Sequence, residues 1–86
     1  MNADKLLKLV RNVRDLKYPI DSLSNSDEFE KELASDLSTT PEEALALLGY
    51  LLARNYVRII PDAGIVVNPG NEEIQAFVRS GKLDAE

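Results

Sequence analysis

Apolar residues recur at helical spacing along the first part of the chain. One apolar stripe lies opposite basic residues, a pattern that predicts an amphipathic helix over about Ala3 to Lys17. The stripe consists of Leu6, Leu9, Val10, Val13 and Leu16. The predicted helix ends before Tyr18 and Pro19, because the residue before a proline is driven out of the α region. Ile20 is then expected to form a very short strand.

The next segment predicts a second helix with an acidic surface. Ser24 or Ser26 is a suitable N-cap, since a serine hydroxyl can accept a hydrogen bond from a free backbone N–H of the first turn. The helix is expected to end near Asp36. Its apolar ridge, at four-residue spacing, consists of Phe29, Leu33 and Leu37, and acids line the rest: Asp27, Glu28, Glu30, Glu32 and Asp36.

A third helix has the clearest start. Thr40 is a good N-cap, Pro41 fits the first helical position, and Glu43 completes a capping box. Asn55 is expected to end this helix in the left-handed conformation. Apolar residues cover one broad face, which we expect to form the centre of the core: Ala44, Leu45, Leu47, Leu48, Leu51 and Leu52.

The third helix is followed at once by a predicted β-hairpin. The first strand is expected over Tyr56 to Ile60, with Val57 and Ile59 on one side. The turn runs from Pro61 to Gly64, because proline presets φ and glycine accepts a positive φ. The return strand is expected over Ile65 to Asn68.

A last helix is expected from Glu72 to about Ser80. Asn71 is its predicted N-cap and Gly81 its predicted end. The residues expected to face inward are Ile74, Phe77 and Val78. Residues 81–86 are expected to form a frayed tail.

This order of elements resembles the winged helix-turn-helix superfamily. The resemblance rests on the order and on the junction Leu48 to Ile59, where a helix with a polar cap runs through an aromatic residue and a valine into a strand. It implies an α+β, mostly helical fold, a small winged helix-turn-helix domain with the order helix, short strand, helix, helix, β-hairpin wing and C-terminal helix. Because 86 residues suffice for one core, we expect a single winged-helix-like domain over residues 1–86.

The composition excludes several kinds of chemistry. The chain has no cysteine and no histidine, so disulfides, thiolate metal sites and the usual proton carrier at neutral pH are absent. Nucleophile and phosphate-loop motifs are also absent. We therefore expect no enzymatic activity, no metal, no cofactor and no small-molecule substrate. No apolar run approaches the ~20 residues that span a membrane, so we expect no membrane partner and a cytoplasmic protein.

The charge of the chain bears on DNA binding. The net charge is −5, and a negative chain is repelled by a polyanion. Residues 1–20, however, hold five basic and two acidic residues, a net charge of +3. In the superfamily that the chain resembles, the third helix enters the major groove, where Glu42 and Glu43 would face phosphates. The alternative function is a DNA-binding transcription regulator that contacts phosphates through the basic first helix and the hairpin, using Lys8, Arg11, Arg14, Arg54 and Arg58.

The outward side of the third helix suits a protein partner better. Ala46, Gly49 and Ala53 lie three and four residues apart, so another backbone can approach closely. Tyr50 adds contact area with a polar tip. The candidate interaction residues are Glu42, Glu43, Ala46, Gly49, Tyr50 and Ala53. We expect a non-enzymatic module that binds a protein partner or a second copy of itself, as a regulatory subunit or a homodimer. The alternative for Gly49 and Ala53 is packing inside the protein, under the first or second helix.

Overall fold

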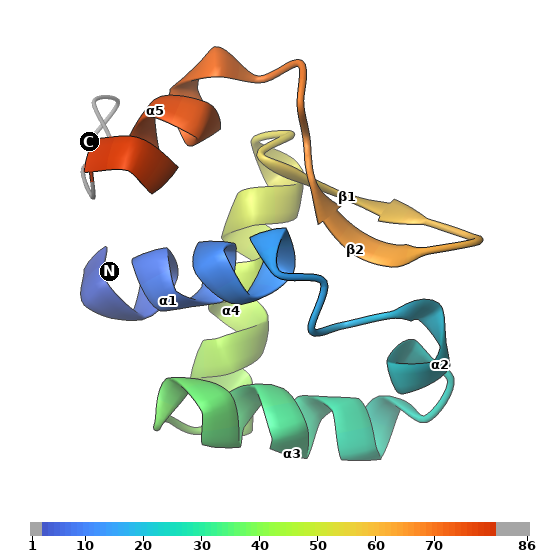
Figure 1. The fold of residues 1–86 in the computed structure, drawn as a ribbon. Coiled ribbons are helices and arrows are strands. Elements are labelled where there is room, and N and C mark those ends of the chain that lie inside the picture. Colours follow the sequence, from blue (N-terminus) through green and yellow to red (C-terminus); the bar gives the residue numbers. More distant parts are fainter. Residues whose placement is uncertain (1–2, 81–86) are drawn as a thin grey trace.

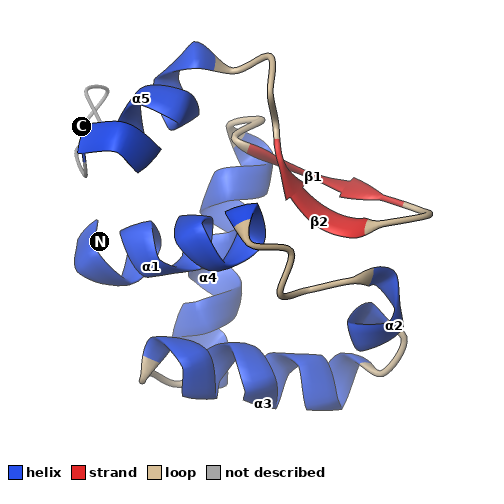
Figure 2. Ribbon diagram, in the orientation of Figure 1, coloured by secondary structure: helices blue, strands red, loops and turns tan. Residues whose placement is uncertain are grey.

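The computed structural model describes residues 3–80, which form five helices and one antiparallel sheet of two strands (Figure 1, Figure 2). In chain order the elements are α1 (Ala3–Arg14), α2 (Ile20–Leu23), α3 (Ser26–Leu37), α4 (Pro41–Ala53), β1 (Val57–Ile60), β2 (Gly64–Val67) and α5 (Glu72–Ser80). The chain thus forms a small α+β fold, mostly helical with one hairpin, and the main elements follow the expected order. The expected helix end at Gly81 and the expected tail over residues 81–86 lie outside the described residues.

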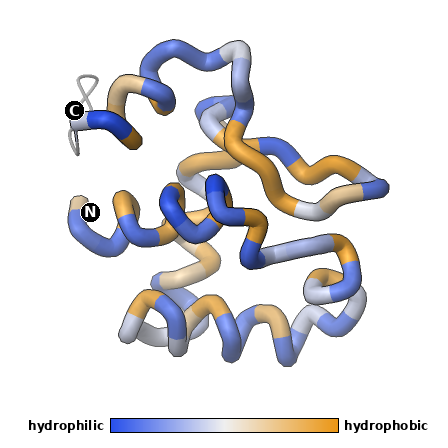
Figure 3. The backbone as a smooth tube through the Cα atoms, in the orientation of Figure 1, coloured by the Kyte–Doolittle hydropathy of each residue, from blue (hydrophilic) through white to orange (hydrophobic). Residues whose placement is uncertain are grey.

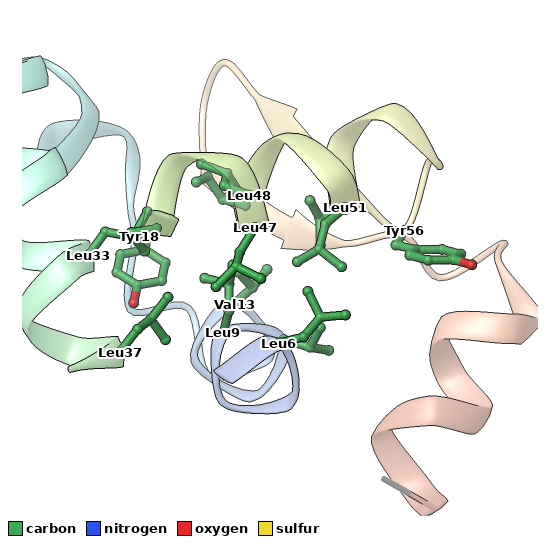
Figure 4. Packing of buried hydrophobic residues seen from close by; sticks show 14 of the residues in the cluster. Leu6, Leu9, Val13, Tyr18, Leu33, Leu37, Leu47, Leu48, Leu51 and Tyr56 are labelled. Carbon is green, nitrogen blue, oxygen red and sulfur yellow. The ribbon is translucent and has the colours of Figure 1, made fainter. Parts of the chain in front are cut away.

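Helix α1 is central to the packing. It lies between α3 and α5 and also contacts α4 and β2 (Figure 1). Hydrophilic and hydrophobic positions alternate at helical spacing along α1 and α3, so each helix turns one apolar stripe to the core (Figure 3). Leu47 of α4 points toward Leu9 and Val13 of α1, while Leu33 and Leu37 of α3 lie beside the Tyr18 ring (Figure 4).

The buried face of α4 is narrower than expected. Its buried residues are Ala44, Leu47, Leu48 and Leu51. Leu45 is 38% exposed and Leu52 is only half-buried, so the expectation that both lie in the centre of the core was wrong for Leu45 and holds only in part for Leu52. Helices α3 and α1 pack against α4, and Leu45 lies at the margin of its buried side.

Three helices end on a residue other than glycine in the left-handed conformation. The φ angles are 59° at Leu16 after α1, 54° at Ser38 after α3 and 61° at Asn55 after α4. The prediction for Asn55 is therefore confirmed. After α4, the Asn55 N–H donates to the Leu52 carbonyl at 3.1 Å and the Tyr56 N–H to the Leu51 carbonyl at 2.9 Å, which is the Schellman pattern.

The same pattern ends α1 earlier than its sequence predicts. The Leu16 N–H donates to the Val13 carbonyl at 3.0 Å, and the Lys17 N–H donates to the Asn12 carbonyl at 3.1 Å. These two bonds close α1 at Arg14 rather than at Lys17. The chain turns away at Leu16, which is 62% exposed, so the prediction that Leu16 continues the apolar stripe of this helix was wrong.

The N-termini of α3 and α4 are capped by side chains. The Thr40 hydroxyl accepts a hydrogen bond from the Glu43 N–H at 3.2 Å, and Pro41 occupies the first turn, as predicted. The cap of α3 is Asn25, whose side chain accepts from the Glu28 N–H at 3.2 Å. The expectation of Ser24 or Ser26 was therefore wrong, since the residue between them has the extended backbone that a cap requires.

The hairpin pairs in register, with Val57 opposite Val67 and Ile59 opposite Ile65. Val57 and Ile65 are buried, as the two-residue period predicts for the inner side. Ile59 lies on the same side but is 50% exposed. The core therefore ends before it reaches this part of β1.

A third segment joins the sheet at the expected place, but as a single bridge. Pro19 pairs with Gly64, the Ile65 N–H donates to the Tyr18 carbonyl at 3.0 Å, and the Ile20 N–H donates to the Ala63 carbonyl at 3.1 Å. Ile20 itself begins α2 rather than a strand. Gly64 has φ +114°, and a Cβ there would collide with the Tyr18 carbonyl oxygen, so only glycine fits this approach.

Candidate protein-interaction surface

The outward side of α4 presents an exposed and largely apolar surface. At 100° per residue it lies opposite the buried leucines, and all of its members are exposed. We call it the α4 surface and define it as Glu42, Leu45, Ala46, Gly49 and Ala53. The structure thus keeps four of the predicted interaction residues together and adds Leu45, which the sequence had assigned to the core.

Gly49 is open to its surroundings. A Cβ built on Gly49 would have no atom within 4 Å, apart from its chain neighbours and the backbone of its own helix. Ala53, one turn further along, is also exposed. The alternative that these two residues pack under another helix is therefore excluded within residues 3–80. Glycine in a helix costs about 1 kcal/mol of stability relative to alanine. No contact in the described fold offsets that cost at Gly49.

Glu43 belongs to the fold rather than to the α4 surface. Its carboxylate accepts a hydrogen bond from the Thr39 hydroxyl at 2.6 Å and lies 3.7 Å from the Lys5 ammonium of α1. The Thr39 hydrogen bond and then the Lys5 charge lower the pKa of Glu43. This predicted interaction residue therefore connects the start of α4 to α1 and keeps its charge at neutral pH.

Tyr50 lies at the border of the α4 surface and is half-buried. The Arg54 guanidinium stacks over its ring, 4.4 Å from the centroid, in a cation–π contact. The ring also meets Tyr56 edge-on, with centroids 6.3 Å apart. The cation–π contact with Tyr50 holds the guanidinium of Arg54, the one basic residue at the end of α4, against its own helix.

The basic residues proposed for phosphate contact come from three elements. Lys8, Arg11 and Arg14 are exposed on α1, whereas Arg54 follows α4 and Arg58 lies in β1. The Arg14 Nε lies 3.2 Å from an Asp15 carboxylate oxygen, so that charge is already paired. The α4 surface itself contains no Arg, Lys, Asn or Gln that could reach a base edge.

Two buried polar groups hold the frame around α4. The Tyr18 hydroxyl accepts a hydrogen bond from the Asn12 amide at 3.1 Å and donates to the Asp36 carboxylate at 3.0 Å. It thereby joins α1 to α3. Burial raises the pKa of Tyr18, and the Asp36 carboxylate raises it further. The Asn68 amide donates to the Asn55 carbonyl at 2.9 Å, which joins the end of α4 to the segment after β2.

Within residues 3–80, no group of three or more acidic side chains is arranged to hold a metal ion. No helix in that range is long and apolar enough to cross a membrane. The acidic residues of α3 are mostly exposed, as on an ordinary solvated helix surface.

The chain was also compared with known proteins. No family model, no curated protein and no solved structure matches it.

Proposed function

We propose that this chain is a non-enzymatic winged-helix module that acts by binding another protein through the α4 surface, as a regulatory subunit or as one half of a homodimer. The observation that carries the proposal is the open, small-residue centre of that surface at Gly49, beside the 38% exposed Leu45. An exposed strip of small apolar residues of this kind admits a partner backbone closely and buries apolar area on contact.

The winged-helix assignment is supported at the level of architecture. Helices α3 and α4 are joined by a short turn, the hairpin β1–β2 follows α4, and the segment at Pro19 bridges to the second hairpin strand. This arrangement agrees with the resemblance drawn from the junction Leu48 to Ile59.

The alternative is a DNA-binding transcription regulator, which the exposed Lys8, Arg11 and Arg58 favour. Two features weigh against it. Glu42 stands exposed at the start of α4, and the hairpin turn carries Asp62 where a phosphate contact needs a basic residue. Nonspecific binding by such a module would depend on a few cations against a net charge of −5.

A photo-crosslinking experiment tests the proposal. The probe residue p-benzoylphenylalanine replaces Ala46 in the α4 surface, or Ser35 on the exposed side of α3 as the matched control. Irradiation in cells of the source organism should give a discrete crosslinked species with the Ala46 probe and none with the Ser35 probe. Gly49→Arg, placed in the same background, should remove that species, because the long charged side chain fills the open strip.

A titration with DNA distinguishes the protein-binding module from a DNA-binding regulator. Mixed-sequence duplex DNA at low salt should leave the backbone amide NMR signals unchanged up to ~100 μM, in the range where nonspecific DNA binders begin to be occupied. Salt-sensitive shifts at Lys8, Arg11 and Arg58 would instead support the regulator. A crosslink yield that is equal for both probes would contradict the α4 surface.

A further inference from the structure

The open edge of the hairpin is a second unoccupied feature, separate from the α4 surface. The sheet has the order β1–β2, and the only additional pairing in residues 3–80 is the bridge from Pro19 to Gly64, on the β2 side. No described segment pairs with the opposite side of β1. Strand β1 is therefore an edge strand, which can act as a template for another extended chain.

The register identifies the backbone groups that face the open side. The Asn68 N–H donates to the Tyr56 carbonyl at 2.9 Å, so this pair is hydrogen-bonded. Hydrogen-bonded and non-hydrogen-bonded pairs alternate in an antiparallel ladder, so Ile59 and Val57 direct their backbone groups away from β2. The backbone groups of Ile65, the residue opposite Ile59, face away from β1, and the Ile65 N–H donates to the Tyr18 carbonyl. Among the described residues, Ile59 has no such counterpart outside the hairpin.

Two large apolar side chains along this edge are left exposed, although the core lies next to them. Ile59 is 50% exposed although its cross-strand neighbour Ile65 is buried, and Ile60 is 37% exposed on the opposite side. A further strand beside β1 would cover both isoleucines and extend the inner side of the sheet. Arg58 lies between Val57 and Ile59 along the strand, on the same side of the sheet as Ile60, and forms no ion pair within residues 3–80.

We propose that the open edge of β1 (Val57, Arg58, Ile59 and Ile60) binds an extended segment of a partner protein as an added strand, and that this segment carries a carboxylate beside Arg58 between two apolar residues. Backbone hydrogen bonds to Ile59 provide the affinity. The alternation of side chains provides the selectivity, because one partner residue meets the Arg58 side of the sheet and its two neighbours meet the Ile59 side.

A second copy of the chain fits this edge less well than an acidic segment. Two β1 strands that pair about a two-fold axis engage the outward backbone groups of both Val57 and Ile59 only when Ile59 faces the partner's Val57. That register sets Arg58 directly opposite its own symmetry mate. Like charges directly opposite in a sheet destabilise the pair. A partner with Asp or Glu at this position removes the repulsion and adds attraction.

The test uses a random 12-residue peptide library displayed on phage and selected against the immobilised full chain. Enriched peptides should contain Asp or Glu flanked by β-branched residues. Their affinities are then measured by fluorescence anisotropy with synthetic peptides, and with versions in which the acid is replaced by lysine. We expect the lysine version to bind the wild-type chain at least ~5-fold more weakly, and Arg58→Glu to reverse that preference.

Two variants of one residue separate the backbone from the side chain. Ile59→Pro removes the outward N–H, at a position where an edge strand tolerates proline, and should weaken binding by at least ~10-fold. Ile59→Thr keeps the N–H and the strand preference and should weaken binding by no more than ~3-fold. Circular dichroism checks the fold of each variant. If Ile59→Pro does not fold, the charge reversal at Arg58 decides the question.

Several results would overturn the proposal. They are a library without any enriched peptide, equal binding to the Ile59→Pro and wild-type chains, or peptides without a charge preference. Sedimentation that shows a dimer dissociated by Ile59→Pro would assign the edge to a second copy instead. Loss of peptide binding in Gly49→Arg but not in Ile59→Pro would move the peptide to the α4 surface. The edge and the proposed function can therefore fail separately.

Discussion

Two glycine-to-alanine changes should have opposite effects on stability. Gly49 lies in the middle of α4, and a Cβ there meets no atom within 4 Å beyond its immediate neighbours. Gly49→Ala should therefore raise the free energy of unfolding by about 0.5–1 kcal/mol, because alanine restricts the unfolded chain and favours the helix. The added methyl group touches nothing in the described fold, so no packing term opposes this gain.

At Gly64 the same methyl group is incompatible with the backbone. The φ angle of +114° is unfavourable for an L-residue by about 1–2 kcal/mol, judged from the cost of left-handed backbone. The Cβ also collides with the Tyr18 carbonyl oxygen, which accepts the Ile65 N–H at 3.0 Å, and losing that hydrogen bond costs about 1 kcal/mol more. Gly64→Ala should thus lower the free energy of unfolding by about 2–3 kcal/mol, a large part of the ~5 kcal/mol typical of a small domain.

Urea unfolding followed by circular dichroism measures both changes, and thermal scans give an independent check. For a domain of this size each 1 kcal/mol shifts Tm by about 4–8 °C, so the two variants should bracket the wild type. A Gly49→Ala variant that is destabilised by more than ~0.5 kcal/mol would refute the open environment of Gly49. A Gly64→Ala variant within ~0.5 kcal/mol of the wild type would refute the close approach of Tyr18. A stable Gly49→Ala also shows that any binding defect of Gly49→Arg arises at the surface.

Three further predictions concern the buried tyrosine, pH and a helix cap. Tyr18→Phe keeps the edge-on contact with Phe29 but leaves the buried Asn12 amide and the Asp36 carboxylate without the hydroxyl, so urea unfolding should show a loss of about 1–3 kcal/mol; an unchanged midpoint would contradict a hydrogen-bonded role for the hydroxyl. Burial raises the pKa of Tyr18 above its ordinary value of 10.0, so above pH 10 the unfolded chain loses a proton that the folded protein retains. The contribution of Tyr18 to stability should therefore be constant up to about pH 10 and then fall by up to ~1.4 kcal/mol per pH unit, so the slope should be smaller in Tyr18→Phe; equal slopes in the two proteins would show that Tyr18 is not responsible. Thr40→Ala removes the acceptor of the Glu43 N–H and should cost about 1 kcal/mol in the same assay, whereas Thr40→Ser should be nearly neutral, and an equal loss in both would point away from the cap.

The local features of the fold follow from short stretches of sequence. Thr40 and Pro41 start α4, Asn71 caps α5 by accepting the Ile74 N–H at 3.0 Å, and Asn55 ends α4 with a positive φ, all as predicted. Each depends on the chemistry of one side chain within a few residues of the backbone groups it serves. The same holds for the order of the elements, because the apolar spacing changes from the helical period to the strand period after Asn55.

The candidate site was predicted in part. Ala46, Gly49 and Ala53 share the outward side of α4, as helical spacing requires. Helical spacing does not show that Glu43 pairs with Thr39 and Lys5, because Lys5 belongs to another helix. The exposure of Leu45 and Ile59 was missed for a related reason. Both residues are spaced like the buried residues of their element. The one feature of the sequence that could have indicated their exposure was their place at the margin of the apolar side.

The sequence by itself determined the order of the main elements, the starts of α4 and α5, which side of each element is apolar and how the charges are distributed, since these depend on neighbours along the chain. The tertiary structure alone decided which apolar residues the other elements reach. Leu16 is exposed because a left-handed turn redirects the chain, and Ile59 because the core ends before the edge of the hairpin. Gly49 is open for the same reason, as the packing of α4 against α1 and α3 occupies only the opposite side. Burial depends on contacts between elements that are distant in sequence, so a pattern along one element identifies the side that can be buried and not how far the burial extends.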